Sequence, residues 1–346
     1  MTEIDIRTEG RAGRITLNRP KALNALTYDM AMALHAALRD WRHDDAVRVV
    51  VIDAAGDKAF CAGGDIADLY RSGTEGDFTY GRTFWADEYR MNAALFEFPK
   101  PVISLMQGFV MGGGVGVGCH GSHRVVGDSS QIAMPECGIG LVPDVGGSLL
   151  LARAPGRLGE YLGLTAARMG PGDAIVAGFA DHYLPEDQWP ALIARLCETG
   201  DAADVAAAAL PTPQGTLAPQ MDRINALFNE GSLPAILAAL RADDSELAAS
   251  ALKSITRNSP LSMAVTLEML KRLRAGAGIR AALDMEYRFT WRAMEQADFL
   301  EGVRAAIIDK DRNPQWRHDL DTVSPDDVAA LLEPLGADAL TFEEEE

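Results

Sequence analysis

Apolar positions in the first part of the chain follow two different periods. Residues 4–7 and 14–17 alternate around a glycine-containing turn, which predicts a β-hairpin. Residues 28–41 carry apolar side chains at helical spacing behind Thr27, a residue suited to cap a helix. The apolar, β-branched run 47–53 predicts a buried strand. This mixture of strand and helix periods predicts an α/β architecture.

The pattern changes along the chain. Strand–turn–helix units continue at 101–121 and 124–153, whereas the chain beyond residue 220 is helical almost throughout. There, Ser259 and Pro260 have the serine-then-proline order of a helix start. Residues 211–215 have the composition of a linker.

We therefore predict two consecutive regions, a mixed region over residues 1–210 and a helical region over 211–346. The final acidic run, 343–346, is expected to be a solvated tail.

Charge narrows the range of partners. The chain of 346 residues has 32 basic and 50 acidic residues, a formal net charge of −18, which argues against nucleic acid and anionic membranes as partners. No run approaches the roughly 18 apolar residues of a membrane span, and the acidic start does not resemble a targeting peptide. We expect a cytoplasmic protein.

The cysteines and histidines do not indicate a metal site. The four cysteines lack C-x-x-C spacing, so neither a zinc site nor a disulfide framework is predicted. Cys61 and Cys137 are better explained as small buried side chains than as thiol nucleophiles. His120 and His123 lack the H-E-x-x-H pattern of zinc-binding helices.

The run 133–147 contains the strongest candidates for chemistry. Glu136 and Asp144 are its two acidic residues, and the residues around them are apolar or glycine. Carboxylates placed against apolar side chains can serve as a general acid and base near neutral pH. Solvated loop carboxylates or helix caps would give the same pattern, so the run alone leaves both interpretations open.

Two glycine-rich segments precede this run, at 60–66 and 111–118. Each follows a strand-like run, and backbone N–H groups in such loops can approach a ligand closely. Two N–H groups directed at one point form an oxyanion hole. Tight turns would also explain either segment. The G-x-G-x-x-G match at 116–121 begins too late after the strand for a dinucleotide loop.

Taken in order, these motifs resemble the crotonase (enoyl-CoA hydratase/isomerase) superfamily. The resemblance rests on 60–66, 111–116 and the N-terminal run 17–26. Its 3-hydroxyisobutyryl-CoA hydrolase branch is similar over more of the chain, namely at 133–147, 87–89, 164–168, 298–305 and 308–311, with Pro314 and Trp316 following. The similarity spans about residues 10–318.

The resemblance implies a fold and a set of site residues. The fold would be a spiral of ββα units, with the C-terminal helical region covering the active site. Gly64 and Gly113 would supply the oxyanion hole. Hydratases have a catalytic glutamate where this chain has Gly116. The hydrolase branch instead combines a glutamate and an aspartate, which match Glu136 and Asp144.

The implied activity is hydrolysis of 3-hydroxyisobutyryl-CoA, a reaction of valine catabolism, with no cofactor because CoA is part of the substrate. Glu88 matches a glutamate that contacts the substrate, and Glu136 would act either as a general base or as a nucleophile. Arg19, Lys21 and Lys58 are candidates for binding the CoA phosphates, although ordinary surface solvation would explain each of them equally well.

Two other functions stay open. An enoyl-CoA hydratase or isomerase would share the oxyanion loops, and a non-catalytic binding protein would share the fold. The superfamily often forms trimers, so a homo-oligomer is compatible with the sequence, but the sequence does not specify an oligomeric state.

Overall fold

The computed structural model describes residues 2–342, so the predicted solvated tail lies outside the described residues. The chain divides into two compact units whose segments interleave along the sequence. Unit 1 holds the chain up to Asp65, Arg90–Ala133 and Arg168–Ala218, and unit 2 holds the remaining segments. These units differ from the consecutive division at residue 210, which stays a prediction.

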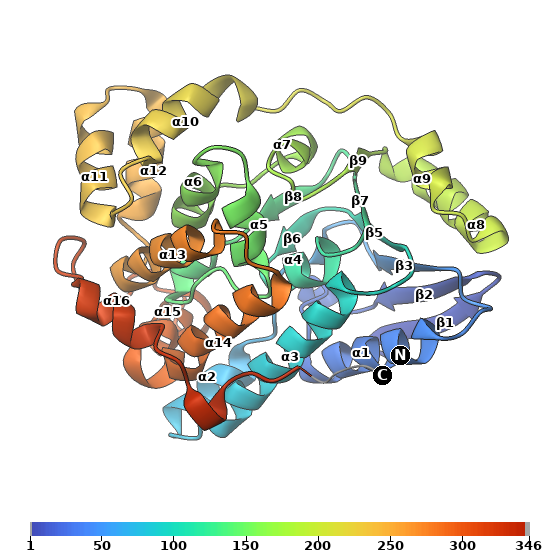
Figure 1. The fold of residues 1–346 in the computed structure, drawn as a ribbon, viewed down its shortest axis with the longest axis horizontal. Coiled ribbons are helices and arrows are strands. Elements are labelled where there is room, and N and C mark those ends of the chain that lie inside the picture. The colour runs from blue at the N-terminus through green and yellow to red at the C-terminus, as the bar shows by residue number, and fades with distance from the viewer. Residues whose placement is uncertain (1, 343–346) are drawn as a thin grey trace. The chain divides into compact units, whose positions relative to one another are not determined.

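Unit 1 is built on a six-stranded sheet with the strand order β1-β2-β3-β5-β7-β9 (Figure 1). Only β1 and β2 are antiparallel, and each later strand pairs in parallel with its neighbour. The strands are β1 (Ile4–Glu9), β2 (Ala12–Leu17), β3 (Val49–Ala54), β5 (Val102–Met106), β7 (His123–Val126) and β9 (His182–Tyr183). The first two strands confirm the predicted hairpin.

A second, three-stranded parallel sheet was not predicted. It has the order β4-β6-β8, and its strands are β4 (Ala59–Cys61), β6 (Phe109–Met111) and β8 (Gln131–Ala133). The successive pairs β3–β4, β5–β6 and β7–β8 each place one strand in each sheet, and a helical segment follows each pair in the sequence. This repeated ββα order confirms the predicted class of fold.

Within the described residues, five α-helices lie wholly in unit 1. They are α1 (Tyr28–Arg42), α4 (Gly113–Gly118), α7 (Pro171–Val176), α8 (Trp189–Thr199) and α9 (Ala203–Ala208). The hydroxyl of Thr27 accepts a hydrogen bond from the backbone N–H of Met30, so the predicted cap of α1 is confirmed. Trp189 and Leu196 of α8 pack with Val51 and Leu105 of the sheet in one buried cluster.

Unit 2 is largely helical. Its helices are α2 (Ala67–Thr74), α5 (Gly147–Arg153), α6 (Leu158–Thr165), α10 (Met221–Phe228), α11 (Leu233–Ala242), α12 (Glu246–Ile255), α13 (Pro260–Leu273), α14 (Ile279–Gln296), α15 (Phe299–Val303) and α16 (Pro325–Leu331). Helix α3 (Thr79–Phe96) begins in unit 2 and continues into unit 1. Ser259 caps α13 through the N–H of Ser262, which confirms the predicted helix start.

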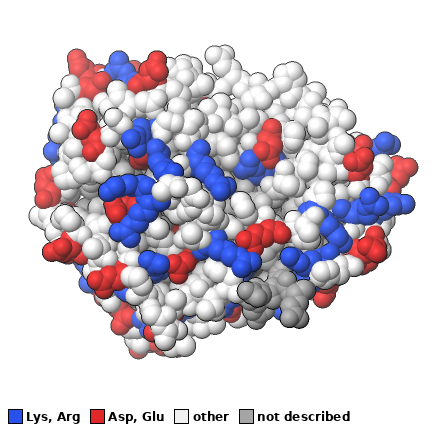
Figure 2. Space-filling view, in the orientation of Figure 1, with Lys and Arg blue, Asp and Glu red and all other residues white. Residues whose placement is uncertain are grey.

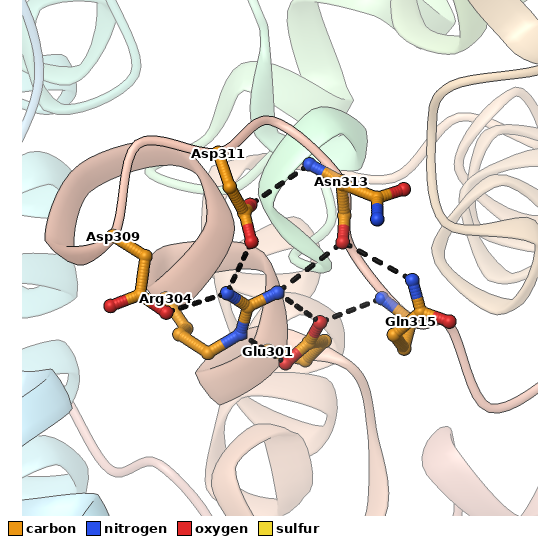
Figure 3. A network of polar contacts seen from close by, with 6 residues as sticks. All are labelled: Glu301, Arg304, Asp309, Asp311, Asn313 and Gln315. Atoms are coloured by element: carbon orange, nitrogen blue, oxygen red, sulfur yellow. Dashed lines mark hydrogen bonds and ion pairs between the residues drawn. The ribbon is translucent and has the colours of Figure 1, made fainter.

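Residues 301–315, which include part of the motif similar to the hydrolase branch, fold around the side chain of Arg304 (Figure 3). The guanidinium of Arg304 donates to Glu301, to Asp309 at 2.6 Å and to Asp311 at 2.7 Å. It also donates to the carbonyl of Asn313 at 3.3 Å, so one side chain holds both ends of this loop. Arg304 lies in a π-helical turn (Arg304–Ile308) that continues α15.

No helix among residues 2–342 is long and apolar enough to cross a bilayer. On the face that Figure 2 displays, Lys and Arg side chains are interleaved with Asp and Glu side chains. The strongly negative net charge therefore does not give this face a single sign.

Candidate active site

The N-terminal run that resembles the superfamily clamps the first glycine loop within unit 1. The amide of Asn24 donates to the carbonyls of Ala55 and Ala59, at 2.9 and 2.8 Å. The N–H of Leu26 donates to the Gly63 carbonyl, and the N–H of Asp65 donates to the Leu26 carbonyl. In a parallel bridge of this kind, the N–H of the middle residue, here Gly64, points away from the clamping segment.

The second glycine loop lies against the first. A Cβ atom added to Gly114 would lie 2.1 Å from the carbonyl oxygen of Cys61, so only glycine allows α4 to approach the end of β4 this closely. A Cβ added to Gly63 would lie 3.7 Å from the Met111 carbonyl oxygen, an ordinary van der Waals contact. Gly113 is the first residue of α4, where N–H groups have no partner within the helix. Gly64 and Gly113 thus lie on two adjoining loops, as the oxyanion prediction requires.

Unit 2 contains a cluster of buried acids. Glu88 of α3, Glu136, Asp144 and Glu286 of α14 are at most 5% exposed. Glu136 begins a short 3-10 helix (Glu136–Ile139) directly after Pro135. The three acids proposed from the sequence are therefore brought together in one unit, with a fourth that the sequence analysis did not identify.

Tyr89 binds one of these acids directly. Its hydroxyl donates a 2.7 Å hydrogen bond to Oδ2 of Asp144, and its ring meets the ring of Tyr287 edge to face. The phenol thus fixes the orientation of the Asp144 carboxyl group. By contrast, Oε1 of Glu88 and Oε2 of Glu136 are buried, and neither has a hydrogen-bond partner among the described residues. Such oxygens are expected to receive donors from a bound molecule.

The surroundings raise the pKa of every acid in the cluster. Burial raises the pKa of Asp144 to about 7, although the hydrogen bond from Tyr89 opposes this shift. Burial, followed by the charge of Asp144, raises the pKa values of Glu88 and Glu136 well above their usual range. Burial raises the pKa of Glu286 to about 8 against the effect of its donors Ser148 and Gly146. Groups that titrate near neutrality can exchange protons during a reaction.

The C-terminal motif supports the turn that carries Glu136. A Cβ on Gly302 would lie 2.2 Å from the Ile139 backbone, and one on Gly140 would lie 2.4 Å from the Asp298 backbone. The N–H of Ser259 also donates to the Cys137 carbonyl at 2.9 Å. Asp298 in turn accepts from the Ser259 hydroxyl at 2.7 Å.

Comparison with known proteins decides the family. The family model described as enoyl-CoA hydratase/isomerase matches residues 12–332. The chain belongs to the enoyl-CoA hydratase/isomerase family. Curated relatives agree with this assignment: the "3-hydroxyisobutyryl-CoA hydrolase, mitochondrial" of Xenopus tropicalis is 40% identical, covering 94% of this chain and 88% of the relative. The human protein of the same name is 36% identical, covering 98% of this chain and 91% of the relative.

Solved structures of the family have the same fold. An enoyl-CoA hydratase from Rhodobacter sphaeroides 2.4.1 is 61% identical with a TM-score of 0.94, covering 99% of this chain and all of the other. A carnitinyl-CoA dehydratase from Mycobacterium thermoresistibile is 42% identical with a TM-score of 0.95, and the match covers both chains completely.

Two positions are those on which the sequence prediction chose a hydrolase over a hydratase. Gly116 lies inside α4 and offers no carboxylate. Asp144 lies in the buried acid cluster instead. The acids of this family member are thus gathered in unit 2, and the glycine loops belong to unit 1. Their joint action in one site stays a prediction.

The three basic residues predicted to bind the CoA phosphates differ in their contacts with the rest of the protein. The Arg19 guanidinium donates to the Ala25 carbonyl at 2.7 Å and pairs with Glu3 and Asp65 at 2.9 and 3.0 Å. This arginine therefore has a structural role in the N-terminal clamp. Lys21 and Lys58 are exposed.

Sequence reasoning missed three polar residues of the cluster region: Tyr89, Ser148 and Glu286. Glu286 had a detectable signal. It lies three residues after Leu283 and four before Thr290 on the buried face of α14, a position where the helical period predicts an apolar side chain. Its partners Gly146 and Ser148 lie about 140 residues earlier, so no local pattern could identify them.

None of the four cysteines forms a disulfide, and all are buried. Burial raises the pKa of the Cys137 thiol to about 12, which disfavours a thiolate in this turn. Within residues 2–342, no three or more His, Cys, Asp or Glu side chains are grouped so that they could hold a metal ion.

The raised pKa of Asp144 predicts how stability depends on pH. A carboxyl group whose pKa is higher in the folded state stabilises the fold at low pH, and that contribution is lost as the pH rises toward about 7. We expect the melting temperature to fall between about pH 5 and about pH 7. Asp144→Asn should make this decline less steep. At the upper pH, the free energy of unfolding of the variant should exceed that of the wild type by an amount on the order of a few kcal/mol, so the variant should have the higher melting temperature.

Asp181 of unit 1 provides a control of opposite sign. Although burial raises its pKa, the hydrogen bonds and charge of Arg124 hold that pKa below its usual value. Asp181→Asn should therefore lower the melting temperature by a similar amount at both pH values. An unchanged slope in Asp144→Asn would contradict the titration assigned to Asp144.

Proposed function

We propose that this family member hydrolyses the thioester of 3-hydroxyisobutyryl-CoA to 3-hydroxyisobutyrate and CoA. The buried pair Glu136 and Asp144 carries the proposal, together with the missing carboxylate at Gly116. The two curated relatives described above, whose names give this activity, support it.

The proposed reaction uses two N–H groups and two acids. The N–H groups of Gly64 and Gly113 would stabilise negative charge on the thioester oxygen. Glu136 would take a proton from water as the water oxygen attacks the carbonyl carbon, or would attack that carbon itself to form an anhydride that water then cleaves. In either route the C–S bond breaks and the CoA sulfur leaves with a proton. Asp144 would hold or exchange that proton and tune Glu136.

Glu88 gives the proposal its substrate class. Its unpartnered, buried oxygen needs a donor, and the hydroxyl group of a 3-hydroxyacyl chain supplies one. A site with such an acceptor disfavours acyl chains that lack the hydroxyl, because the buried oxygen then stays unpaired. We further propose that Lys21 and Lys58 contact the CoA phosphates.

The first experiment follows thiol release from 3-hydroxyisobutyryl-CoA and from isobutyryl-CoA, which lacks the hydroxyl. We expect kcat/KM to be at least about 10²-fold higher for the hydroxylated substrate. Hydration of crotonyl-CoA, followed by absorbance, serves as the competing assay. Equal release from both thioesters would contradict the role of Glu88.

A hydratase is the second candidate, because the 61%-identical solved structure is described as an enoyl-CoA hydratase. Hydration of crotonyl-CoA without thiol release would favour it. Inactivity toward every thioester would favour a binding protein. We further propose that the reaction is a step of valine breakdown. We also propose that it takes place in the cytoplasm, although the curated relatives are named as mitochondrial.

A further inference from the structure

Glu286 is a fully buried acid outside the set that the proposed reaction uses. Its side chain is 0% exposed, on the inner face of α14 between Leu283 and Thr290. Its hydrogen bonds among residues 2–342 come from two backbone N–H groups and one hydroxyl, and none comes from a basic side chain. A buried acid without a cation must be held by hydrogen bonds, since burial otherwise strongly disfavours it.

Within residues 2–342, all three donors to Glu286 come from one turn of the chain. Its Oε2 accepts from the N–H of Gly146 at 2.8 Å. Its Oε1 accepts from the N–H of Ser148 at 3.2 Å and from the Ser148 hydroxyl in a short contact. The first turn of helix α5 has no side-chain cap from its own N-cap residue. Glu286, which is far away in the sequence, instead accepts hydrogen bonds from the N–H groups at this helix start.

The same turn carries Asp144 and is conformationally strained. Val145 has φ +53° and Gly146 has φ +79°, and the N–H of Gly147 donates to the Asp144 carbonyl at 2.7 Å. Positive φ at both central residues is the pattern of a type I′ turn, which favours glycine or asparagine. A β-branched valine is unfavourable in this conformation and persists only where the surroundings enforce it.

We propose that Glu286 is a positioning residue for Asp144: it anchors the strained turn so that the Asp144 carboxyl group stays directed at the hydroxyl of Tyr89 and toward the acid cluster. The inference rests on the proposed function for its kinetic consequence, but not for the anchoring itself. Both oxygens of Glu286 are needed, because one meets Gly146 and the other meets Ser148.

The anchoring is tested without any substrate. Glutamine matches the size of glutamate but has one acceptor oxygen, and its NH2 group would face an N–H donor. In Glu286→Gln, we expect the amides of Gly146 and Ser148 to exchange hydrogen at least about 10-fold faster, measured on peptides covering 141–150. Wild-type exchange rates in this variant would overturn the proposal.

The kinetic test uses turnover of 3-hydroxyisobutyryl-CoA. We expect Glu286→Gln to lower kcat by about 10²-fold, because a small displacement of a reacting group has an effect of that size, and to change KM by less than about threefold. In an Asp144→Asn background, Glu286→Gln should lower kcat by less than about threefold, because both changes act through the same carboxyl group.

Glu160 of α6 supplies a matched control. It is 5% exposed and pairs with Arg157 at 2.9 Å and Arg274 at 2.5 Å, in the same unit. Glu160→Gln should lower the melting temperature while leaving exchange at 141–150 and kcat per folded enzyme within about threefold of wild type.

The outcomes separate the two proposals. A wild type that releases no thiol would sink the proposed hydrolase, and the exchange experiment would still decide whether Glu286 anchors the turn. Faster exchange with unchanged kcat in an active enzyme would overturn the positioning role. The positioning role would also be overturned if the kcat losses of Glu286→Gln and Asp144→Asn multiplied fully in the double variant.

Discussion

Replacing Glu136 by glutamine is expected to lower kcat for thioester hydrolysis by about 10³-fold. Glutamine can neither take a proton from water nor attack the carbonyl carbon, so both routes open to Glu136 fail. Burial and the charge of Asp144 already disfavour the ionised glutamate, so the neutral side chain should fold at least as well as the wild type. Thiol release and thermal melting, measured on the same preparations, check both statements.

Glu160→Gln again serves as the comparison, because it removes a buried carboxylate from an ion pair in the same unit. That variant should lose stability and keep its turnover, the reverse of Glu136→Gln. If Glu136→Gln retains more than a tenth of wild-type kcat, Glu136 does not perform the chemistry, and Asp144 becomes the principal candidate.

Gly114→Ala is expected to damage both the fold of unit 1 and the reaction. The new Cβ would lie 2.1 Å from the Cys61 carbonyl oxygen, and a backbone atom cannot rotate out of the way as a side chain can. Helix α4 must therefore shift away from β4, which costs about 1–3 kcal/mol or more. The shift moves the Gly113 N–H, and losing one oxyanion donor lowers kcat by about 10²- to 10³-fold. Melting temperature and thiol release measure the two effects.

Two other glycines of unit 1 provide control substitutions for Gly114→Ala. A Cβ on Gly118, also in α4, would meet the side chains of Met106 and Phe60, which can adjust, so Gly118→Ala should have a smaller effect. Gly170 caps α7, has φ −72° and has open space around its Cβ position, so Gly170→Ala should cost at most about 1 kcal/mol and leave turnover unchanged. Wild-type stability and turnover in Gly114→Ala would contradict the close approach of the two loops.

Local patterns were sufficient for the long elements and failed for the short ones. Helix α1 has both a cap and an apolar stripe, and β3 is a continuous apolar run, so each is determined by its own residues. Strands β4, β6 and β8 have three residues each, too few to show a period. They form because they pair with one another across long stretches of sequence.

In the candidate site, too, some residues could be predicted from local motifs and others could not. Glu88, Glu136 and Asp144 could be selected because each lies in a motif with a recognisable order of residues. The hydrogen bond from Tyr89 to Asp144 joins residues 55 positions apart, and the one from Gly146 to Glu286 joins residues 140 apart. Such contacts are properties of the tertiary structure, and no periodic pattern contains them.

The support that Gly302 gives to the turn of Glu136 also sets an order of events during synthesis. Residues 136 and 302 are separated by almost half of the length of the chain, and the close backbone contact at Ile139 needs the later segment. At roughly 5–20 residues per second, the ribosome adds the later segment on the order of ten seconds after the earlier one. During that interval the nascent chain already contains every proposed catalytic acid, yet it lacks the scaffold that holds Glu136. The turn of Glu136 can therefore gain this support only after residue 302 has been added to the chain.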